Sequence, residues 1–161
     1  PADWEPLRRR FLDELVLPRI PQAALALVCQ HQRAGDRVVL TTATNRFLTT
    51  LTAEYLGISE VIATEPELVD GRFTGRSSGV LNMREGKVVR LHAWLAQQGL
   101  QLDQFDSTAF SDSINDLPLL EAADHAVVVN GDAKLSAIAA QRGWRMLRLS
   151  DADLPAAQGA R

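Results

Sequence analysis

The length and composition fit one compact domain, because 161 residues with 46% hydrophobic side chains are enough to bury a core. A net charge of −3, with basic residues spread along the chain, leaves no electrostatic footprint for nucleic acid. No apolar run reaches membrane-spanning length, the first residues lack a signal-peptide pattern and Cys29 is the only cysteine, which together predict a cytoplasmic protein without membrane partner or internal disulfide.

Helical and extended patterns alternate along the chain from residue 21 onward. Apolar residues three and four positions apart mark the helices, and runs of β-branched and apolar residues mark the strands. The predicted elements in chain order are a helix at residues 21–33 that ends at Gly35, a strand at 37–42, a helix at 45–56, a strand at 60–64, a hairpin within 68–79, a helix at 87–98, a strand at 107–110, a helix around 117–123, a strand at 125–130, a helix at 132–142 and an extended segment at 144–149. Cys29 lies in an apolar run of the first helix and is expected to be buried.

This alternation predicts an α/β protein with a doubly wound, mainly parallel, Rossmann-like sheet and helices on both faces. Residues 1–20 depart from the pattern, because their apolar residues have helical spacing and no strand precedes them. We therefore expect a helical element at 1–20 and an α/β core domain at 21–161. No internal repeat and no Gly-x-Gly-x-x-Gly loop for a dinucleotide occurs.

The most informative segment is FSDSINDLPLL at residues 110–120, where a predicted strand runs into a predicted helix. It places Asp112 at the carboxyl end of the strand, where open α/β sheets bind ligands, and Asp116 about one turn later. Two carboxylates at this spacing can hold a divalent cation. The alternative is that Asp112 or Ser113 only caps the helix and that Asp116 only complements the helix dipole.

Three further residues suggest a phosphate site. Thr42 ends a hydrophobic strand just before a helix, where a hydroxyl and free backbone amides can bind a phosphate oxygen. Lys87 lies at a helix start, where the helix dipole makes a cation unfavourable. A lysine at this position is easier to explain if it binds an anion. Asn115 can donate to the same anion. The alternatives are that Thr42 and Thr44 are ordinary caps and that Lys87 is a solvated surface residue.

The order of these motifs resembles motifs two, three and four of the haloacid dehalogenase (HAD) superfamily of phosphohydrolases, and most closely its phosphoserine phosphatase-like branch. The segments that carry the resemblance are TATNRF at residues 42–47, DGRFTG at 70–75, GKV at 86–88 and SDSINDLPLL at 111–120. The resemblance covers about residues 21–149 and implies a HAD-like core.

The resemblance also implies a role for each residue. Thr42 and the backbone amide of Ala43 would bind the transferring phosphoryl group, with Asn115 near it. Lys87 would neutralise charge on the phosphate and the nucleophile, and Asp112 and Asp116 would form a Mg²⁺ site. The catalytic residues of this chain would then be Lys87, Asp112 and Asp116. The implied reaction is hydrolysis of a small phosphorylated metabolite through an aspartyl-phosphate.

One family motif has no counterpart in this sequence. The first motif, a hydrophobic strand followed by Asp-x-Asp-x-Thr, supplies the nucleophile in the family. Asp3 follows no strand and Asp13 lies in a helical pattern, so neither replaces it. The resemblance therefore implies that the nucleophile lies in a segment absent from this chain and that the chain of 161 residues alone is inactive. Residues 1–20 would be the end of a helical cap, and a place between the strands ending at Thr42 and Asp112 would be unfilled.

Two kinds of function remain open from the sequence. The first is a magnesium-dependent phosphatase seen in incomplete form, and the alternative is a non-catalytic module that binds a phosphate-bearing ligand or a partner. A response-regulator receiver shares the order of threonine and lysine, but its acidic cluster would lie in the first half of the chain. Neither the substrate nor the oligomeric state follows from the sequence.

Overall fold

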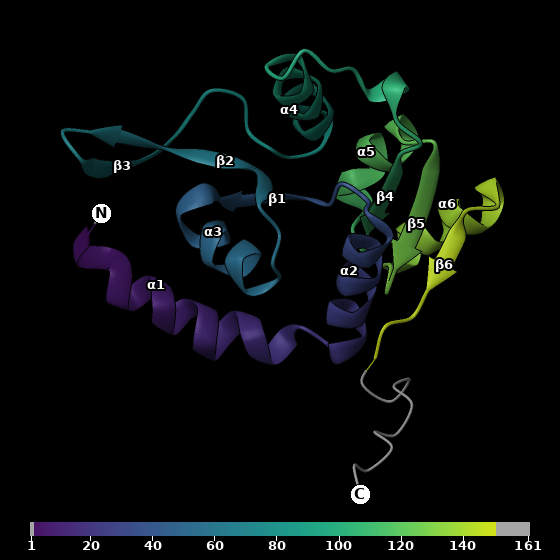
Figure 1. Ribbon diagram of the computed structural model, residues 1–161, viewed down its shortest axis with the longest axis horizontal. Helices are drawn as coiled ribbons and strands as arrows, with labels where there is room; N and C mark the ends of the chain where they lie inside the picture. The colour runs from purple at the N-terminus through teal and green to yellow at the C-terminus, as the bar shows by residue number, and fades with distance from the viewer. Residues whose placement is uncertain (1, 151–161) are drawn as a thin grey trace, which may run out of the picture.

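The computed structural model describes residues 2–150, in which helices and strands alternate as predicted (Figure 1). The helices are α1 (Glu5–Phe11), α2 (Gln22–Ala34), α3 (Arg46–Tyr55), α4 (Glu85–Ala96), α5 (Leu117–Ala122) and α6 (Ala133–Arg142). The strands are β1 (Val39–Asn45), β2 (Glu60–Val69), β3 (Arg72–Ser78), β4 (Thr108–Ser111), β5 (His125–Val129) and β6 (Arg145–Leu147). Short helical turns occupy Ala2–Trp4, Leu12–Val16, Leu17–Arg19, Leu102–Gln104 and Ile114–Asp116.

The α/β class is confirmed, and the described strands form two three-stranded sheets. The sheet is thus divided between β1 and β4, where the resemblance implies an unfilled place. In the first sheet β1 pairs in parallel with β2, and β2 pairs antiparallel with β3. In the second sheet β4, β5 and β6 are all parallel. Within residues 2–150, β1 and β4 are outer strands of different sheets and do not pair with each other. Each of them therefore has one edge that no described strand covers.

The end of β1 lies later than predicted, at Asn45. The pairing register with β2 shifts between Thr42 and Asn45. The side chain of Asn45 accepts a hydrogen bond from the backbone N–H of Leu48 at 3.0 Å, so Asn45 caps α3. The interpretation of Thr42 or Thr44 as the cap is wrong. The Thr42 hydroxyl instead accepts from the N–H of Thr44 at 3.1 Å, a local bond that stabilises the irregular strand end.

Helix α2 ends as predicted, because Gly35 takes the left-handed conformation with φ 85° that a helix C-cap favours. The expectation of a buried Cys29 is wrong, since this residue is exposed and no residue of α2 is buried. The reason is that α2 is not enclosed between packed layers. Its His31 ring contacts Phe110 of the outer strand β4 at a centroid distance of 5.4 Å.

The predicted hairpin is formed by β2 and β3, which project away from the rest of the fold in Figure 1. Its turn consists of Asp70 and Gly71, with φ of 48° and 74°. Positive φ at both residues is what a two-residue hairpin turn of the favoured twist requires. Strand β2 extends beyond the predicted end at residue 64 because its second half pairs with β3.

The main core lies in the second sheet and the helices beside it. Its buried apolar residues come from β4, α5, β5 and α6: Ala109, Leu119, Leu120, Ala126, Val128, Leu135 and Ala139. Leu91 of α4 packs against this cluster. Helix α4 is therefore attached to the second half of the molecule, the half built around the sheet β4–β5–β6, whereas the first half is built around β1–β2–β3. In the first half the buried residues include Ala53 of α3 and Ile62 and Ala63 of β2.

Residues 2–20 are a succession of helical turns, in agreement with the helical pattern of their sequence. Helix α1 lies against α3 and the hairpin. The guanidinium of Arg8 is 4.8 Å from the centre of the Phe47 ring, and the Trp4 and Phe73 rings are 6.4 Å apart. A cavity of about 850 Å³ lies among these elements and is lined mainly by apolar side chains. It reaches the end of β1 at Asn45.

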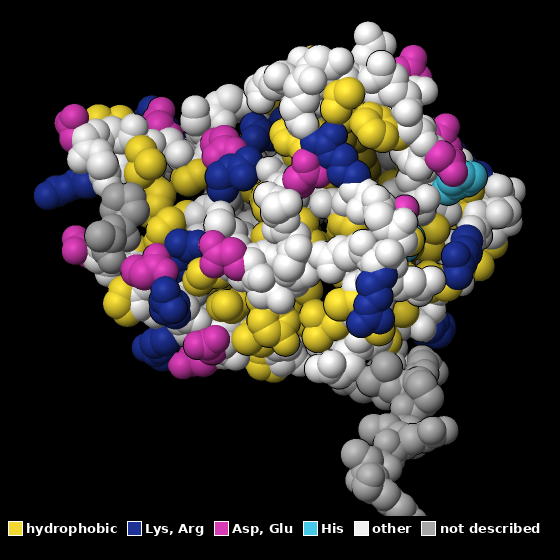
Figure 2. Space-filling view, in the orientation of Figure 1, with side chains coloured by type: hydrophobic (Ala, Val, Ile, Leu, Met, Phe, Trp, Pro, Cys, Tyr) yellow, Lys and Arg dark blue, Asp and Glu magenta, His cyan; other side chains and the backbone are white. Residues whose placement is uncertain are grey.

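The surface along α1 combines exposed apolar residues with paired charges, as Figure 2 shows. Leu7 and Leu15 are 53% and 48% exposed. Arg10 and Glu14 form an ion pair at 3.1 Å beside them. Charges of both signs are interspersed on this face. No helix within residues 2–150 is long and apolar enough to cross a membrane.

Candidate active site

Lys87 lies in the first turn of α4, as predicted, and is 6% exposed. Its Nζ donates a hydrogen bond to Oδ2 of Asp116 at 2.7 Å. An ammonium group removed from water needs an anionic partner, because an unpaired buried charge is strongly unfavourable. The interpretation of Lys87 as a solvated surface lysine is therefore wrong, and the anion that it binds in this structure is a carboxylate.

Asp116 receives a second hydrogen bond at the same oxygen. The hydroxyl of Ser111, the last residue of β4, donates to Oδ2 of Asp116 at 2.8 Å. The Asp116 side chain is 15% exposed, so the ion pair with Lys87 is partly shielded from water. Asp116 occupies the N-cap position of α5 but makes no side-chain cap bond. Its carboxylate is turned toward the lysine instead, which favours the charge-pairing interpretation over simple helix capping.

The start of α4 is sterically constrained. A Cβ atom on Gly86 would lie 2.1 Å from the backbone oxygen of Leu81, so no larger residue fits without a backbone shift. Arg84, at the N-cap position, has φ 51° and ψ −127°, which is rare for a residue with a side chain. Its Nε donates to Oδ1 of Asn115 at 3.2 Å. The first turn of α4 is thus connected to the loop after β4 by two side chains, Arg84 and Lys87.

The loop that carries Asp112 is also held by Asp132, the residue just before α6. The backbone N–H of Asp132 donates to the carbonyl oxygen of Asp112 at 3.1 Å. The Asp132 carboxylate accepts from the N–H groups of Leu135 at 2.8 Å and Ile114 at 3.0 Å. These bonds lower the pKa of Asp132 below its ordinary value, that from Leu135 most strongly. The loop is therefore fixed through its backbone.

The Asp112 side chain itself is exposed, and within residues 2–150 no hydrogen bond or ion pair engages its carboxylate. The capping interpretation holds for its neighbour Ser113, whose hydroxyl accepts from the N–H of Asn115 at 3.2 Å. It does not hold for Asp112. A fixed backbone with an unengaged carboxylate leaves Asp112 available to a ligand from solution.

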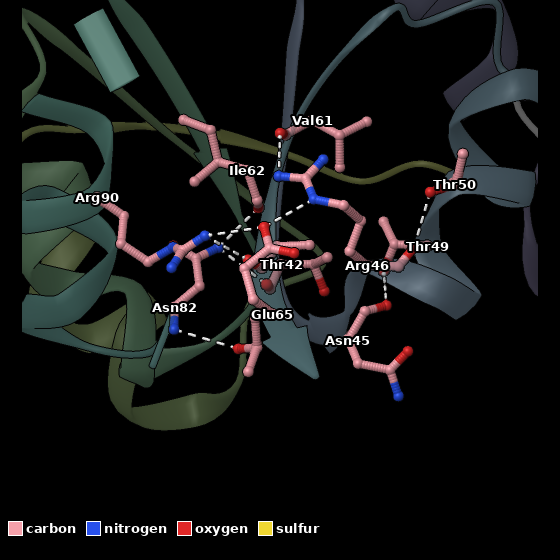
Figure 3. A network of polar contacts seen from close by, with 12 residues as sticks. Thr42, Asn45, Arg46, Thr49, Thr50, Val61, Ile62, Glu65, Asn82 and Arg90 are labelled. Carbon is pink, nitrogen blue, oxygen red and sulfur yellow. Dashed lines mark hydrogen bonds and ion pairs between the residues drawn. The ribbon is translucent and has the colours of Figure 1, made fainter. Parts of the chain in front are cut away.

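Thr42 is held by a residue that sequence reasoning missed, Asn82. The Asn82 side chain is fully buried, and its Nδ2 lies 2.8 Å from the Thr42 carbonyl oxygen, 2.7 Å from that of Ile62 and 3.0 Å from the Thr41 hydroxyl (Figure 3). This amide joins β1 and β2. Ala43, by contrast, is exposed and lies within the register shift of β1.

The predicted site residues are thus brought together to different degrees. Lys87 and Asp116 are in direct contact, and Asn115 is connected to the same helix start through Arg84. Thr42 is connected to the segment before α4 through Asn82. Ser111 was part of the quoted motif but had no assigned role. Asn82 and Arg84 lie in an irregular segment whose residue types carry no recognisable pattern, so the sequence offered no signal for them.

The described residues supply an incomplete set of ligands for a metal ion. No group of three or more His, Cys, Asp or Glu side chains suited to a metal lies within residues 2–150. Mg²⁺ prefers six oxygen ligands and usually retains several waters. Asp112 offers a free carboxylate, whereas Asp116 is already shared by Lys87 and Ser111. Two carboxylates of this kind fit part of a Mg²⁺ site, and the remaining ligands would be water or groups outside these residues.

The family model of haloacid dehalogenase-like hydrolases matches residues 1–121. The chain therefore belongs to the haloacid dehalogenase-like hydrolase family. A protein from Neisseria meningitidis serogroup C named histidinol-phosphatase is 41% identical over 141 residues, which are 86% of this chain and 64% of that protein. A phosphoserine phosphatase from Mycobacterium tuberculosis is 36% identical over 145 residues, 90% of this chain and 46% of its own length. The chain thus spans about two thirds of the first of these relatives and about half of the second.

Solved structures share the fold of this chain. The crystal structure of a protein of unknown function from Bordetella pertussis Tohama I is 41% identical, with a TM-score of 0.88 over 91% of this chain and 66% of that chain. A substrate-bound phosphoserine phosphatase has a TM-score of 0.58 at 18% identity, over 78% of this chain and 56% of that chain, a likeness that shows the fold alone. The family predicted from the motifs is confirmed.

Proposed function

We propose that this chain is part of a Mg²⁺-dependent phosphomonoester hydrolase that acts on a small phosphorylated metabolite. Its family supports hydrolysis, and the names of its relatives, a histidinol-phosphatase and a phosphoserine phosphatase, support a polar phosphorylated substrate. The observation that carries the proposal is the nearly buried Lys87, fixed 2.7 Å from Asp116. Phosphoryl transfer depends mainly on fixed positive charge and alignment, which this geometry can supply.

In this proposal Lys87 stabilises the negative charge that spreads over the phosphoryl oxygens and the attacking carboxylate. The Thr42 hydroxyl and the backbone N–H of Ala43 bind the same phosphoryl group, and the Asn115 amide lies beside it. The irregular end of β1 supports this role, because the register shift between residues 42 and 45 leaves that segment outside the regular ladder.

Asp112 and Asp116 would hold the Mg²⁺ ion. When bound, the ion would supply a Lewis acid that neutralises charge on the phosphoryl oxygens. Asp112 contributes a free carboxylate on a fixed backbone. Asp116 orients Lys87 and contributes to the metal site from a second position.

The nucleophile in this proposal is an aspartate carboxylate from a segment outside this sequence. It attacks phosphorus, the alcohol leaves, and water then hydrolyses the aspartyl-phosphate. The uncovered edges of β1 and β4 support a further strand at this place, because strand edges carry backbone groups that need partners. Residues 1–20 are then the end of a helical cap and residues 21–161 a core domain without its first strand. The cavity beside α1 would receive the organic part of the substrate.

The test is hydrolysis of a generic phosphomonoester, p-nitrophenyl phosphate, by the full-length gene product. We expect turnover with Mg²⁺, loss of turnover with EDTA and its return when Mg²⁺ is restored in excess. Retention of inorganic phosphate by the full-length protein without any turnover, on this ester and on phosphoserine and histidinol phosphate, would instead favour the non-catalytic module.

A further inference from the structure

We infer that Arg90 is a positioning residue that holds Lys87 at the candidate site by tying α4 to the first sheet. The structural part of this inference stands on the contacts of Arg90, and its catalytic consequence rests on the proposed phosphatase function. Arg90 touches none of the residues assigned to phosphate or metal. It acts through the helix that carries Lys87.

Arg90 binds the first half of the molecule through several acceptors. Its Nη2 donates to the carbonyl oxygen of Ala63 at 2.7 Å and to Oε1 of Glu65 at 3.2 Å, both on β2. Its Nη1 donates to the carbonyl oxygen of Val80, in the segment before α4, at 3.0 Å. The Arg90 side chain is 18% exposed, so these bonds are made largely out of water. A planar guanidinium bound at several points fixes orientation as well as distance.

Arg90 and Lys87 are three residues apart on α4, so they lie on neighbouring parts of the same helix surface. Lys87 reaches Asp116 after β4, whereas Arg90 reaches β2. Within residues 2–150 no strand pairing joins the sheets that contain β2 and β4. The position of α4 between these halves therefore depends on side-chain contacts such as those of Arg90.

Stability alone does not explain the presence of an arginine here. The Nε atom of Arg90 is buried without a hydrogen-bond partner among the described residues, which is unfavourable. A buried ion pair can often be replaced by apolar residues without loss of stability. An arginine can fix the position of α4 through directional hydrogen bonds, whereas a buried apolar side chain cannot.

Arg46 provides a matched control, because it binds the same carboxylate from another helix. Its Nε donates to Oε1 of Glu65 at 2.7 Å, and its Nη2 donates to the carbonyl oxygen of Val61 at 3.1 Å (Figure 3). Arg46 begins α3 and has no contact with α4 among the hydrogen bonds of residues 2–150. Removal of Arg46 thus breaks an ion pair to Glu65 and leaves the attachment of α4 to β2 in place.

The experiment compares Arg90→Met with Arg46→Met in the full-length gene product. Two quantities are measured: kcat and KM on p-nitrophenyl phosphate, and the ¹⁵N NMR signal of the Lys87 ammonium. We expect Arg90→Met to lower kcat about tenfold to a hundredfold and to move or broaden the Lys87 signal, because a small misplacement of a reacting group has effects of this size. Arg46→Met should change kcat less than about threefold and leave the signal unchanged. Arg90→Lys should retain part of the wild-type kcat and part of the wild-type Lys87 signal.

The inference is overturned if Arg90→Met keeps the wild-type kcat and Lys87 signal. It is also overturned if, in Arg90→Met and Arg46→Met alike, the loss of kcat simply follows the loss of stability. Should Arg90→Met not fold, Arg90→Lys decides by the same two measurements. Should the wild-type protein show no phosphatase activity, the proposed function fails, and the Lys87 signal alone decides whether Arg90 positions this lysine.

Discussion

Nζ of Lys87 lies 2.7 Å from Oδ2 of Asp116, and the two side chains are only 7% and 15% exposed. Lys87 lies in the first turn of α4, which Arg90 attaches to the first sheet, and Asp116 follows β4, an outer strand of the second sheet. The pair therefore fixes α4 to the loop after β4, while Arg90 joins the same helix to β2, and the two sheets share no strand pairing within residues 2–150. Because the pair is shielded, removal of either partner leaves a charge that water cannot fully solvate.

Lys87→Met and Asp116→Asn should each destabilise the protein, by about 1–3 kcal/mol, because each leaves the other group without its charged partner. The double variant should lose less than the sum of the two, with a coupling of at least about 1 kcal/mol. Urea unfolding of the four proteins measures this coupling. Strictly additive losses would mean that the ion pair contributes nothing in solution.

Asp112→Asn should separate activity from stability. The Asp112 carboxylate is exposed and unengaged among the described residues, so its free energy of unfolding should change by no more than about 0.5 kcal/mol. Turnover of the full-length gene product should fall to near zero, because Mg²⁺ would lose a charged ligand. An unchanged dependence of the rate on Mg²⁺ concentration would remove Asp112 from the metal site.

Gly86→Ala tests the steric constraint on the helix that carries Lys87. Alanine in place of glycine normally stabilises a helix by about 1 kcal/mol. Here the new Cβ would meet the Leu81 backbone oxygen at 2.1 Å, so we expect destabilisation instead, together with a shift of the Lys87 ammonium signal. The sign of the change in unfolding free energy is decisive, and a stabilised variant would show that the contact relaxes easily.

Asp124→Asn should alter stability in a pH-dependent way. The Ser107 hydroxyl donates to Oδ2 of Asp124 at 2.6 Å and the Ser107 N–H donates at 2.8 Å, and these bonds lower the pKa of Asp124. A lowered folded-state pKa gives stability that is complete above the unfolded value of about 3.9 and is lost as pH falls through the folded value. The variant should therefore be less stable at pH 7, and the difference should shrink below about pH 4. Thermal unfolding of the wild type and the variant across this pH range measures the difference in stability. A difference that does not change with pH would contradict a lowered pKa of Asp124 in the folded protein.

Local patterns in the sequence predicted most elements of the fold, because helix periodicity, glycine C-caps and the Asp70-Gly71 turn are local signals. The end of β1 was less predictable. Asn45, and not Thr42 or Thr44, caps α3, since the strand continues through an irregular register before the helix begins. The exposure of Cys29 was missed because apolar spacing shows which face of a helix is apolar and not whether a layer covers that face.

The candidate site was predictable where residue order carried information, and less so where contacts are long-range. Lys87 and Asp116 were both expected in the site, but their direct ion pair depends on how two halves of the fold pack. Asn82 and Arg90 had no pattern to mark them, because a buried amide or guanidinium is recognised only by its acceptors in space. Periodicity does not encode the division of the strands into two sheets, and only the resemblance led us to expect an unfilled place between the strands ending at Thr42 and Asp112.

The most direct test of the central proposal compares two proteins under identical conditions, the full-length gene product and the 161-residue chain alone. Both are mixed with Mg²⁺ and p-nitrophenyl phosphate, and a covalent phosphoenzyme is sought by acid quench and mass spectrometry. We predict Mg²⁺-dependent turnover and a phosphorylated aspartate in the full-length protein, on a residue outside the 161, and neither in the shorter chain. Turnover by the 161-residue chain at the same rate, with the phosphoryl group on one of its own aspartates, would contradict the proposal that the nucleophile lies elsewhere.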